Sequence, residues 1–219
     1  MSTTRKKGFA SIVIDVDSTL CGVEGIDWLA SRHAPETGVL VAALTERAMR
    51  GDIPLDEVYG RRLELVRPSA DDLAALAVAY EDALAPGAER AVKKLLRAGR
   101  RVVLVSGGLR EAILPVAIKL GLHASDVCAV SVRADDGGRF AGYDQASPLC
   151  TAGGKRRIVE TLELETPILA VGDGATDLAM RPAVDAFAAF TGFVRRAPVV
   201  EQADHVLTSF THLAELALA

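Results

Sequence analysis

The sequence predicts an α/β fold, a doubly wound parallel sheet with a small helical cap inserted after its first strand. Short β-branched runs alternate with helical segments from residue 84 onward, which is typical of parallel β-α-β units. Residues 21–83, by contrast, show helical patterns and no convincing strand. We therefore expect an α/β core made of residues 1–20 and 84–219, and a helical cap made of residues 21–83.

The first strand is expected at residues 9–14, an apolar run that suits a fully buried position. The cap helices are expected at 36–50, 54–66 and 70–83. Asp52 and Ser69 provide N-terminal signals for two of these helices. In the core, further strands are expected at 101–105, 127–133, 139–143, 168–171, 184–190 and 205–207. The core helices are expected between Gly87 and Gly99 and at 110–120, 155–164 and 176–180. The strands at 127–133 and 139–143 are expected to pair as a hairpin.

Composition excludes several classes of protein. The formal net charge is −4 over 219 residues, so no overall positive field points to nucleic acid. No apolar run approaches the roughly 20 residues of a membrane span, and only a short strand, rather than a secretory hydrophobic segment, follows basic residues 5–7. Cys21, Cys128 and Cys150 lack Cys-x-x-Cys spacing, which argues against a zinc site or a disulfide framework. We expect a cytoplasmic monomer or homodimer without nucleic-acid or membrane partners.

Acidic residues follow two of the predicted strands. Asp15 and Asp17 come directly after the first strand, and Asp173 and Asp177 follow the strand at 168–171. Because ligands of open parallel sheets bind beyond the carboxyl ends of the strands, these four side chains are expected at one edge. Such carboxylates repel each other unless a cation lies between them, and hard oxygen ligands suit Mg²⁺. The sequence therefore predicts a magnesium site.

Hydroxyl, glycine and ammonium groups near these acids predict phosphate chemistry. Ser106 and the amides of Gly107 and Gly108 follow the second core strand and could cradle phosphoryl oxygens at a helix N-terminus. Lys155 could neutralise a transferring phosphoryl group. A serine-hydrolase elbow would need glycine where Leu104 stands, and the sequence contains no P-loop of an ATP-binding kinase.

These motifs, in this order, resemble the haloacid dehalogenase superfamily of phosphohydrolases. Within that superfamily, segments 15–27, 106–110, 153–155 and 172–177 resemble the phosphoserine phosphatase family, and the similarity extends from residue 9 to about residue 212. The resemblance implies a Rossmann-like haloacid dehalogenase core. It also implies a Mg²⁺-dependent phosphatase that hydrolyses O-phospho-L-serine to L-serine and phosphate, the last step of serine biosynthesis, through an aspartyl-phosphate intermediate.

The resemblance implies distinct roles for the core residues. Asp15 is expected to be the nucleophile, which splits a very slow hydrolysis into two easier steps. Asp17 is expected to protonate the leaving alkoxide and then to deprotonate water. Asp15, Asp173 and the backbone carbonyl of Asp17 are expected to bind Mg²⁺, with Lys155 neutralising the nucleophile. Asp177 is expected to orient Lys155 or a water on the metal from the next layer of residues.

Five further residues are expected to bind the substrate: Glu24, Arg62, Ser106, Gly107 and Thr176. Arg62 falls in the apolar stripe of its predicted helix, where a guanidinium needs either a ligand or an internal partner. Arg62 could therefore bind a substrate carboxylate through two hydrogen bonds, or it could form an ion pair inside the protein, and the sequence does not decide between the two. The resemblance implies that Glu24 recognises the substrate amino group and Arg62 its carboxylate.

The sequence leaves open two alternative functions and the role of two neighbouring arginines. The same core could serve a related phosphatase or phosphotransferase that acts on phosphohomoserine, phosphothreonine or a sugar phosphate. A non-catalytic binding module is a second alternative, although the presence of every core acid and Lys155 argues against it. One of Arg195 and Arg196, or neither of them, could approach the site, and Arg196 aligns better with the family.

Overall fold

The computed structural model describes residues 8–33, 35–49 and 52–219, so that basic residues 5–7 and residue 50 of the predicted first cap helix lie outside the described residues. A six-stranded sheet with the order β3-β2-β1-β6-β7-β8 forms its centre. The strands are β1 (Ser11–Ile14), β2 (Arg101–Leu109), β3 (Val127–Val130), β6 (Ile168–Gly172), β7 (Ala186–Phe190) and β8 (His205–Leu207). Every neighbouring pair is parallel, which confirms the predicted α/β fold class.

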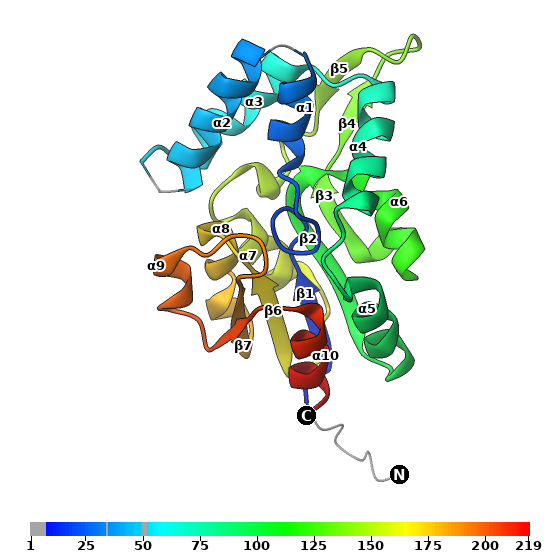
Figure 1. Cartoon of the computed structure of the whole chain (residues 1–219), viewed down its shortest axis with the longest axis vertical. Helices are drawn as coiled ribbons and strands as arrows, with labels where there is room; N and C mark the ends of the chain where they lie inside the picture. Colours follow the sequence, from blue (N-terminus) through cyan, green and yellow to red (C-terminus); the bar gives the residue numbers. More distant parts are fainter. Residues whose placement is uncertain (1–7, 34, 50–51) are drawn as a thin grey trace.

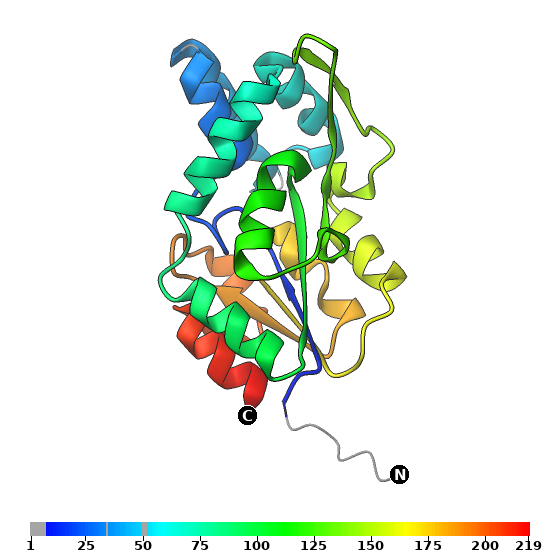
Figure 2. The same ribbon diagram turned by 90° about the vertical axis from the view of Figure 1, so that its right-hand side faces the viewer.

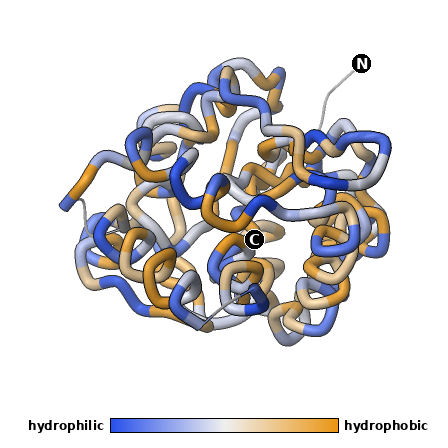
Figure 3. The backbone as a smooth tube through the Cα atoms, turned by 90° about the horizontal axis from the view of Figure 1, so that it is seen from above, coloured by the Kyte–Doolittle hydropathy of each residue, from blue (hydrophilic) through white to orange (hydrophobic). Residues whose placement is uncertain are grey.

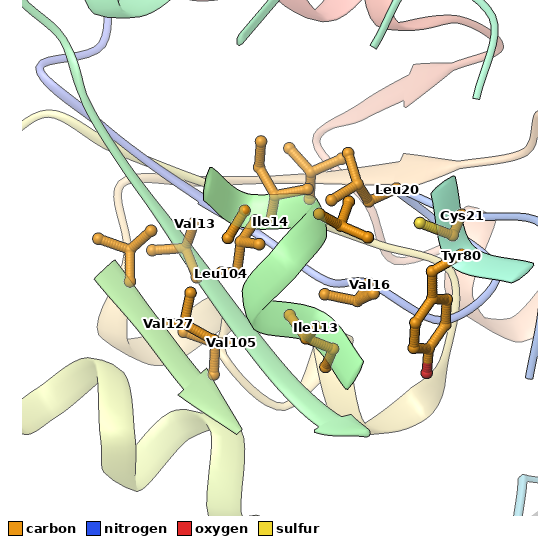
Figure 4. Packing of buried hydrophobic residues seen from close by; sticks show 14 of the residues in the cluster. Val13, Ile14, Val16, Leu20, Cys21, Tyr80, Leu104, Val105, Ile113 and Val127 are labelled. Carbon is orange, nitrogen blue, oxygen red and sulfur yellow. The ribbon is translucent and has the colours of Figure 1, made fainter. Parts of the chain in front are cut away.

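The core of the molecule is built around β1, which pairs with β2 on one side and β6 on the other. Ile14 lies beside Leu104 of β2 and Val171 of β6, and all three are fully buried. Figure 4 shows Val13, Ile14, Leu104 and their apolar neighbours packed between the strands and α6. Burying one such side chain stabilises the fold by about 1.5–3 kcal/mol, so this continuous apolar run places β1 in the middle of the sheet.

Helices cover both faces of the sheet. The core helices are α5 (Ala88–Arg97), α6 (Arg110–Leu120), α7 (Gly154–Thr161), α8 (Ala175–Leu178), α9 (Ala197–Val200) and α10 (Phe210–Leu218), with short 3₁₀ helices at Ala124–Asp126, Pro148–Cys150 and Arg181–Ala183. The packed pair α5 and α10 lies on one side of the sheet, and α7 lies on the other (Figure 2). Along the peripheral helices, hydrophobic and hydrophilic residues alternate (Figure 3), as expected where one side packs and the other faces solvent.

Four helices lie beyond the carboxyl ends of the strands (Figure 1). They are α1 (Gly25–His33), α2 (Pro35–Met49), α3 (Leu55–Val66) and α4 (Ala70–Asp82). The chain enters and leaves this group through two adjacent segments that hydrogen-bond to each other. The Gly22 amide donates to the Ala83 carbonyl at 2.8 Å, and the Ala85 amide donates to the Leu20 carbonyl at 2.9 Å.

The predicted hairpin is only partly right. The run at 127–133 divides into β3, which joins the main sheet beside β2, and β4 (Val132–Ala134), which pairs with β5 (Phe140–Tyr143). Both halves contain valine, so composition alone did not reveal the change of sheet between them. The β4–β5 hairpin lies against α3 and the start of α4, because the Ala70 amide donates to the Gly138 carbonyl at 2.8 Å and the Tyr59 and Tyr143 rings lie 5.9 Å apart.

Ser106, Gly107 and Gly108 were expected at a helix N-terminus, after a strand ending at residue 105, but they lie within β2. Strand β2 continues through Leu109, which pairs with Val130 of β3, and α6 begins only at Arg110. The register between β2 and β3 shifts after Val105, so the extra residues are accommodated as an irregularity in the strand rather than as a turn. The helix predicted to reach residue 164 ends at Thr161.

The sequence predicted neither a membrane-spanning helix nor a disulfide framework, and the structure can be compared with both predictions only for the described residues. Within the parts of the chain that the structure describes, no helix combines the length and apolar composition that a membrane crossing requires. Cys21, Cys128 and Cys150, all described, are free thiols.

Candidate active site

Three buried carboxylates meet where the central strands end. Asp15 follows β1, and Asp173 follows the adjacent strand β6. Asp177 lies one turn into α8, and one carboxylate oxygen from each of the three acids lies within 4.8 Å of the others. A Cβ at Gly172 would lie 2.1 Å from the Asp177 Cγ, so only glycine leaves room for this carboxylate beneath the strand end.

Lys155 neutralises part of this acidic cluster. Its Nζ lies 2.5 Å from Asp15 Oδ1 and 2.7 Å from Asp177 Oδ1, and all three side chains are buried. Burial alone lowers the pKa of Lys155, but the charges of Asp15 and Asp177 raise it by more, so the net shift is upward. Lys155 is therefore a fixed ammonium group beside the Asp15 carboxyl.

The ionised forms of Asp173 and Asp15 are disfavoured in this site. Burial, followed by repulsion from Asp177, raises the pKa of Asp173 to about 7, although the neighbouring Arg196 opposes the shift. Burial and Asp177 also raise the pKa of Asp15 well above its ordinary value. Arg196 forms an ion pair with Asp173 Oδ2, and the Thr19 hydroxyl donates to Asp173 Oδ1 at 3.1 Å. Hard, closely spaced oxygen ligands with raised pKa values fit a divalent cation, which would relieve the repulsion.

Asp17 is held in a different environment. Its Oδ1 accepts a hydrogen bond from the Tyr80 hydroxyl at 2.5 Å and another from the Gly25 amide at 3.3 Å. Burial, and then the charge of Glu24, raise the pKa of Asp17 to about 7, while the Tyr80 and Gly25 hydrogen bonds oppose the shift. A carboxyl group with this pKa is populated in both forms near neutral pH, which suits it to donate a proton and then accept one.

Glu24 and Arg62 line the same cavity as the acidic cluster. The Ser18 hydroxyl donates to Glu24 Oε1 at 2.6 Å. The Arg62 Nη2 lies 3.0 Å from Asp27 Oδ1, so the internal ion pair exists. Arg62 is only 5% exposed, and within the described part of the chain its Nε has no hydrogen-bond partner. The guanidinium therefore retains a free donor beside the cavity.

Ten of the residues predicted to form the site surround one cavity, which we call the site cavity, whereas Gly108, whose amide was also expected to bind phosphate, does not line it. The ten residues are Asp15, Asp17, Glu24, Arg62, Ser106, Gly107, Lys155, Asp173, Thr176 and Asp177. Ser106 Oγ, also buried, accepts a hydrogen bond from the Gly108 amide at 2.9 Å. Arg196 lines the same cavity, whereas Arg195 is exposed, which resolves the assignment that the sequence left open.

Sequence reasoning missed several residues that shape the site. Tyr80 from α4 contacts Asp17, and the Tyr59 hydroxyl from α3 donates to the Gly107 carbonyl at 2.6 Å. Both tyrosines lie in apolar stripes, so they looked like core residues. Thr19 could have been found, because it lies two residues after Asp17, in a segment that resembles the family. Asp27 gave no local signal of its contact with Arg62.

Known proteins are similar to this chain in sequence and architecture. The phosphoserine phosphatase of Mus musculus is 35% identical over 206 residues, which cover 93% of this chain and 91% of the mouse protein. A crystal structure of a phosphoserine phosphohydrolase-like protein from Francisella tularensis superposes with a TM-score of 0.82 at 25% identity, covering 94% of this chain and 98% of that one. A phospho-aspartyl intermediate analogue of phosphoserine phosphatase superposes with a TM-score of 0.75 at 26% identity, covering 96% and 99%.

A family model described as haloacid dehalogenase-like hydrolase matches residues 12–182, a span that contains the acidic cluster, Lys155 and the helices above them. The chain belongs to the haloacid dehalogenase-like hydrolase family.

Proposed function

We propose that this hydrolase converts O-phospho-L-serine and water to L-serine and phosphate, with Asp15 as the nucleophile and Mg²⁺ as the cofactor. The observation that carries the proposal is the site cavity itself. It combines a buried carboxylate next to a fixed ammonium, 2.5 Å from Lys155 Nζ, with Glu24 and Arg62 at the same opening. The latter two complement the amino and carboxylate groups of an amino acid, and the relatives named above are phosphoserine phosphatases.

In the first step, an Asp15 carboxylate oxygen attacks phosphorus and the bond to the serine oxygen breaks. Asp17 donates its proton to that oxygen, so serine leaves as a neutral alcohol rather than as an alkoxide. Lys155, Ser106, Gly107 and Thr176 bind the phosphoryl oxygens as their charge is redistributed.

In the second step, the deprotonated Asp17 accepts a proton from water, and the resulting hydroxide attacks the phosphorus of the aspartyl-phosphate. The bond to Asp15 breaks, phosphate leaves, and both carboxyl groups return to their starting forms. The pKa of about 7 for Asp17 is suited to both transfers.

The cation is expected between Asp15, Asp173 and the backbone carbonyl of Asp17, because the acidic cluster lies there. When bound, Mg²⁺ supplies positive charge that offsets the carboxylates and the phosphoryl group. Asp177 keeps its place through Lys155 at 2.7 Å and through the Gly174 amide at 2.9 Å, so it holds the ammonium in position.

We also propose that residues 21–83 act as a cap domain on a core of residues 1–20 and 84–219. The two hydrogen-bonded segments at 20–22 and 83–85 are the natural hinge, because they join the helices to the sheet. A closed cap excludes water during the first step. Because the reaction releases free serine, a role in serine biosynthesis in the cytoplasm belongs to the same proposal.

Substrate profiling tests the proposal. Phosphate release with Mg²⁺ is measured for phosphoserine, phosphothreonine, phosphohomoserine and sugar phosphates, and in parallel with EDTA in place of the metal. We expect the highest kcat/KM for phosphoserine and no turnover with EDTA. A higher kcat/KM for another phosphomonoester, or equal rates in EDTA, would contradict the substrate or the cofactor respectively.

A further inference from the structure

Tyr80 connects the helices above the sheet to the general acid below them. It belongs to α4, its side chain is fully buried, and its hydroxyl lies 2.5 Å from Asp17 Oδ1. Figure 4 shows the Tyr80 ring among Val16 and Cys21, with its oxygen pointing away from these apolar neighbours. This hydroxyl does not line the site cavity, so its contact with the site is through Asp17.

The backbone confines the Tyr80 hydroxyl to one position. A Cβ at Gly25 would lie 2.2 Å from the Tyr80 oxygen, and a Cβ at Gly108 would lie 3.2 Å from it. A side chain at position 25 would therefore displace the hydroxyl, whereas glycine leaves the space that it fills. A hydroxyl held between two backbone segments is a rigid donor.

We propose that Tyr80 is a positioning residue that orients the Asp17 carboxyl group and determines which of its oxygens carries the transferred proton. Two donors, the Tyr80 hydroxyl and the Gly25 amide, converge on Oδ1. An oxygen that accepts two hydrogen bonds is the unprotonated one, so the acid proton resides on Oδ2. Oδ2 is then the atom that serves the leaving oxygen. This role rests on the proposed function of Asp17.

Tyr80 makes the orientation of the Asp17 carboxyl group depend on the position of α4. Asp17 follows β1 in the sheet, whereas Tyr80 comes from the last of the four helices above it. Movement of α4 away from the sheet would remove a donor from Oδ1 and release the carboxyl group to rotate. The acid is therefore set in its working orientation when α4 is seated against the core.

The test compares leaving groups in Tyr80→Phe, which keeps the ring and removes the hydroxyl. An alkyl leaving group such as serine needs a proton as it departs, whereas p-nitrophenolate is a stable anion that departs without one. The parameter is kcat/KM, which reports the steps through departure of the leaving group. We expect kcat/KM to fall about tenfold for phosphoserine, because a misoriented acid loses part of a contribution of about 10²–10⁴-fold. For p-nitrophenyl phosphate we expect a change of less than about twofold.

Tyr143→Phe is the matched control, because this tyrosine of the β4–β5 hairpin also packs against the helices but does not contact Asp17. It should leave both substrates unaffected. Gly25→Ala should reproduce the selective loss by displacing the hydroxyl, and it should add little selective loss in the Tyr80→Phe background. This second variant keeps the test open if Tyr80→Phe lowers the thermal midpoint severely.

Three results would overturn the inference: no loss in Tyr80→Phe, equal losses on both substrates, or a selective loss in Tyr143→Phe as well. Failure of the proposed substrate gives a different result, in which the unmodified enzyme cleaves p-nitrophenyl phosphate but not phosphoserine. The same leaving-group comparison is then made with glycerol phosphate as the alkyl substrate, and the outcomes for Tyr80 keep their meaning.

Discussion

Arg62 forms the internal ion pair that its sequence position left open, and it also lines the site cavity, where the carboxylate clamp is our proposal. It pairs internally with Asp27, whose Oδ1 also accepts the Thr45 hydroxyl at 2.6 Å. An arginine can hold an internal carboxylate with one nitrogen and present another to a ligand, because its donors spread over a planar fork. The ion pair with Asp27 therefore holds the guanidinium in place and leaves its Nε without a hydrogen-bond partner among the described residues.

The change Arg62→Ala should raise KM for phosphoserine about 10- to 100-fold, because a hydrogen bond to a charged group contributes about 1.5–3 kcal/mol. KM for p-nitrophenyl phosphate, which has no carboxylate, should change far less. Steady-state kinetics on both substrates provides the measurement. Arg61→Ala, at the exposed neighbouring position, is the control and should change neither value. Parallel losses on both substrates in Arg62→Ala would indicate a structural arginine.

At the level of single residues, the sequence allowed prediction of side chains that belong to compact motifs. Asp15, Asp17, Asp173 and Asp177 follow strands whose ends meet, so local spacing was enough to place them together. Tyr80 contacts Asp17 across 63 positions of the chain, and only the packing of α4 against the sheet creates that contact. Such partners are not visible in local patterns.

Individual helices depend on their end groups as well as on packing. At the start of α4, Ser69 Oγ accepts a hydrogen bond from the Asp72 amide at 3.2 Å, and Asp72 Oδ2 accepts one from the Ser69 amide at 3.0 Å. This reciprocal pair satisfies two amides that the helix leaves unpaired. The sequence predicted Ser69 as an N-terminal signal, and the structure confirms it.

Removing this cap in Ser69→Ala should lower the free energy of unfolding by about 1 kcal/mol. The thermal midpoint should fall by about 2–4 °C for a protein of this size. Turnover at a temperature well below that midpoint should stay unchanged, because the site cavity does not include Ser69. Ser31→Ala is the control, since this exposed hydroxyl only bonds back to the Trp28 carbonyl within its helix. Equal losses in the two variants would contradict a capping role.

For the strands, prediction succeeded where composition and pairing agree. The runs at 9–14, 101–105 and 168–171 are apolar and β-branched, and they form the three central strands β1, β2 and β6. It failed at 127–133, because the change from the main sheet to the hairpin occurs within one continuous run that contains valine on both sides of the change. The hairpin then contacts α3 and the start of α4, which are distant in the sequence.

Across the whole molecule, the acidic cluster links stability to pH. In the folded chain the pKa values of Asp17 and Asp173 are about 7, compared with an ordinary value of 3.8. Folding therefore favours their protonated forms, and that contribution is complete only below about pH 4. As the pH rises toward 7, the unfolded chain ionises first and the contribution is lost.

The free energy of unfolding of the metal-free protein should therefore fall between about pH 5 and about pH 7. Saturating Mg²⁺ should reduce the decline, because a ligand that binds the ionised folded state stabilises it. Urea unfolding in EDTA and in Mg²⁺ at both pH values provides the measurement. Asp173→Asn, which cannot ionise, should show a shallower decline in EDTA. A free energy of unfolding that rises with pH in EDTA would contradict the raised pKa values of Asp17 and Asp173.

The central claim is that Asp15 carries the phosphoryl group, and direct trapping tests it most simply. The enzyme is mixed with phosphoserine radiolabelled on phosphorus and quenched in acid, and bound label is counted in one portion. A second portion is treated with borohydride, which reduces an acyl phosphate to an alcohol with release of phosphate but does not reduce a carboxylate. We predict a reduced side chain at position 15, and neither label nor reduction in Asp15→Asn, which should fold normally but turn over no substrate. Label retained on Ser106, or steady turnover by Asp15→Asn, would contradict the account.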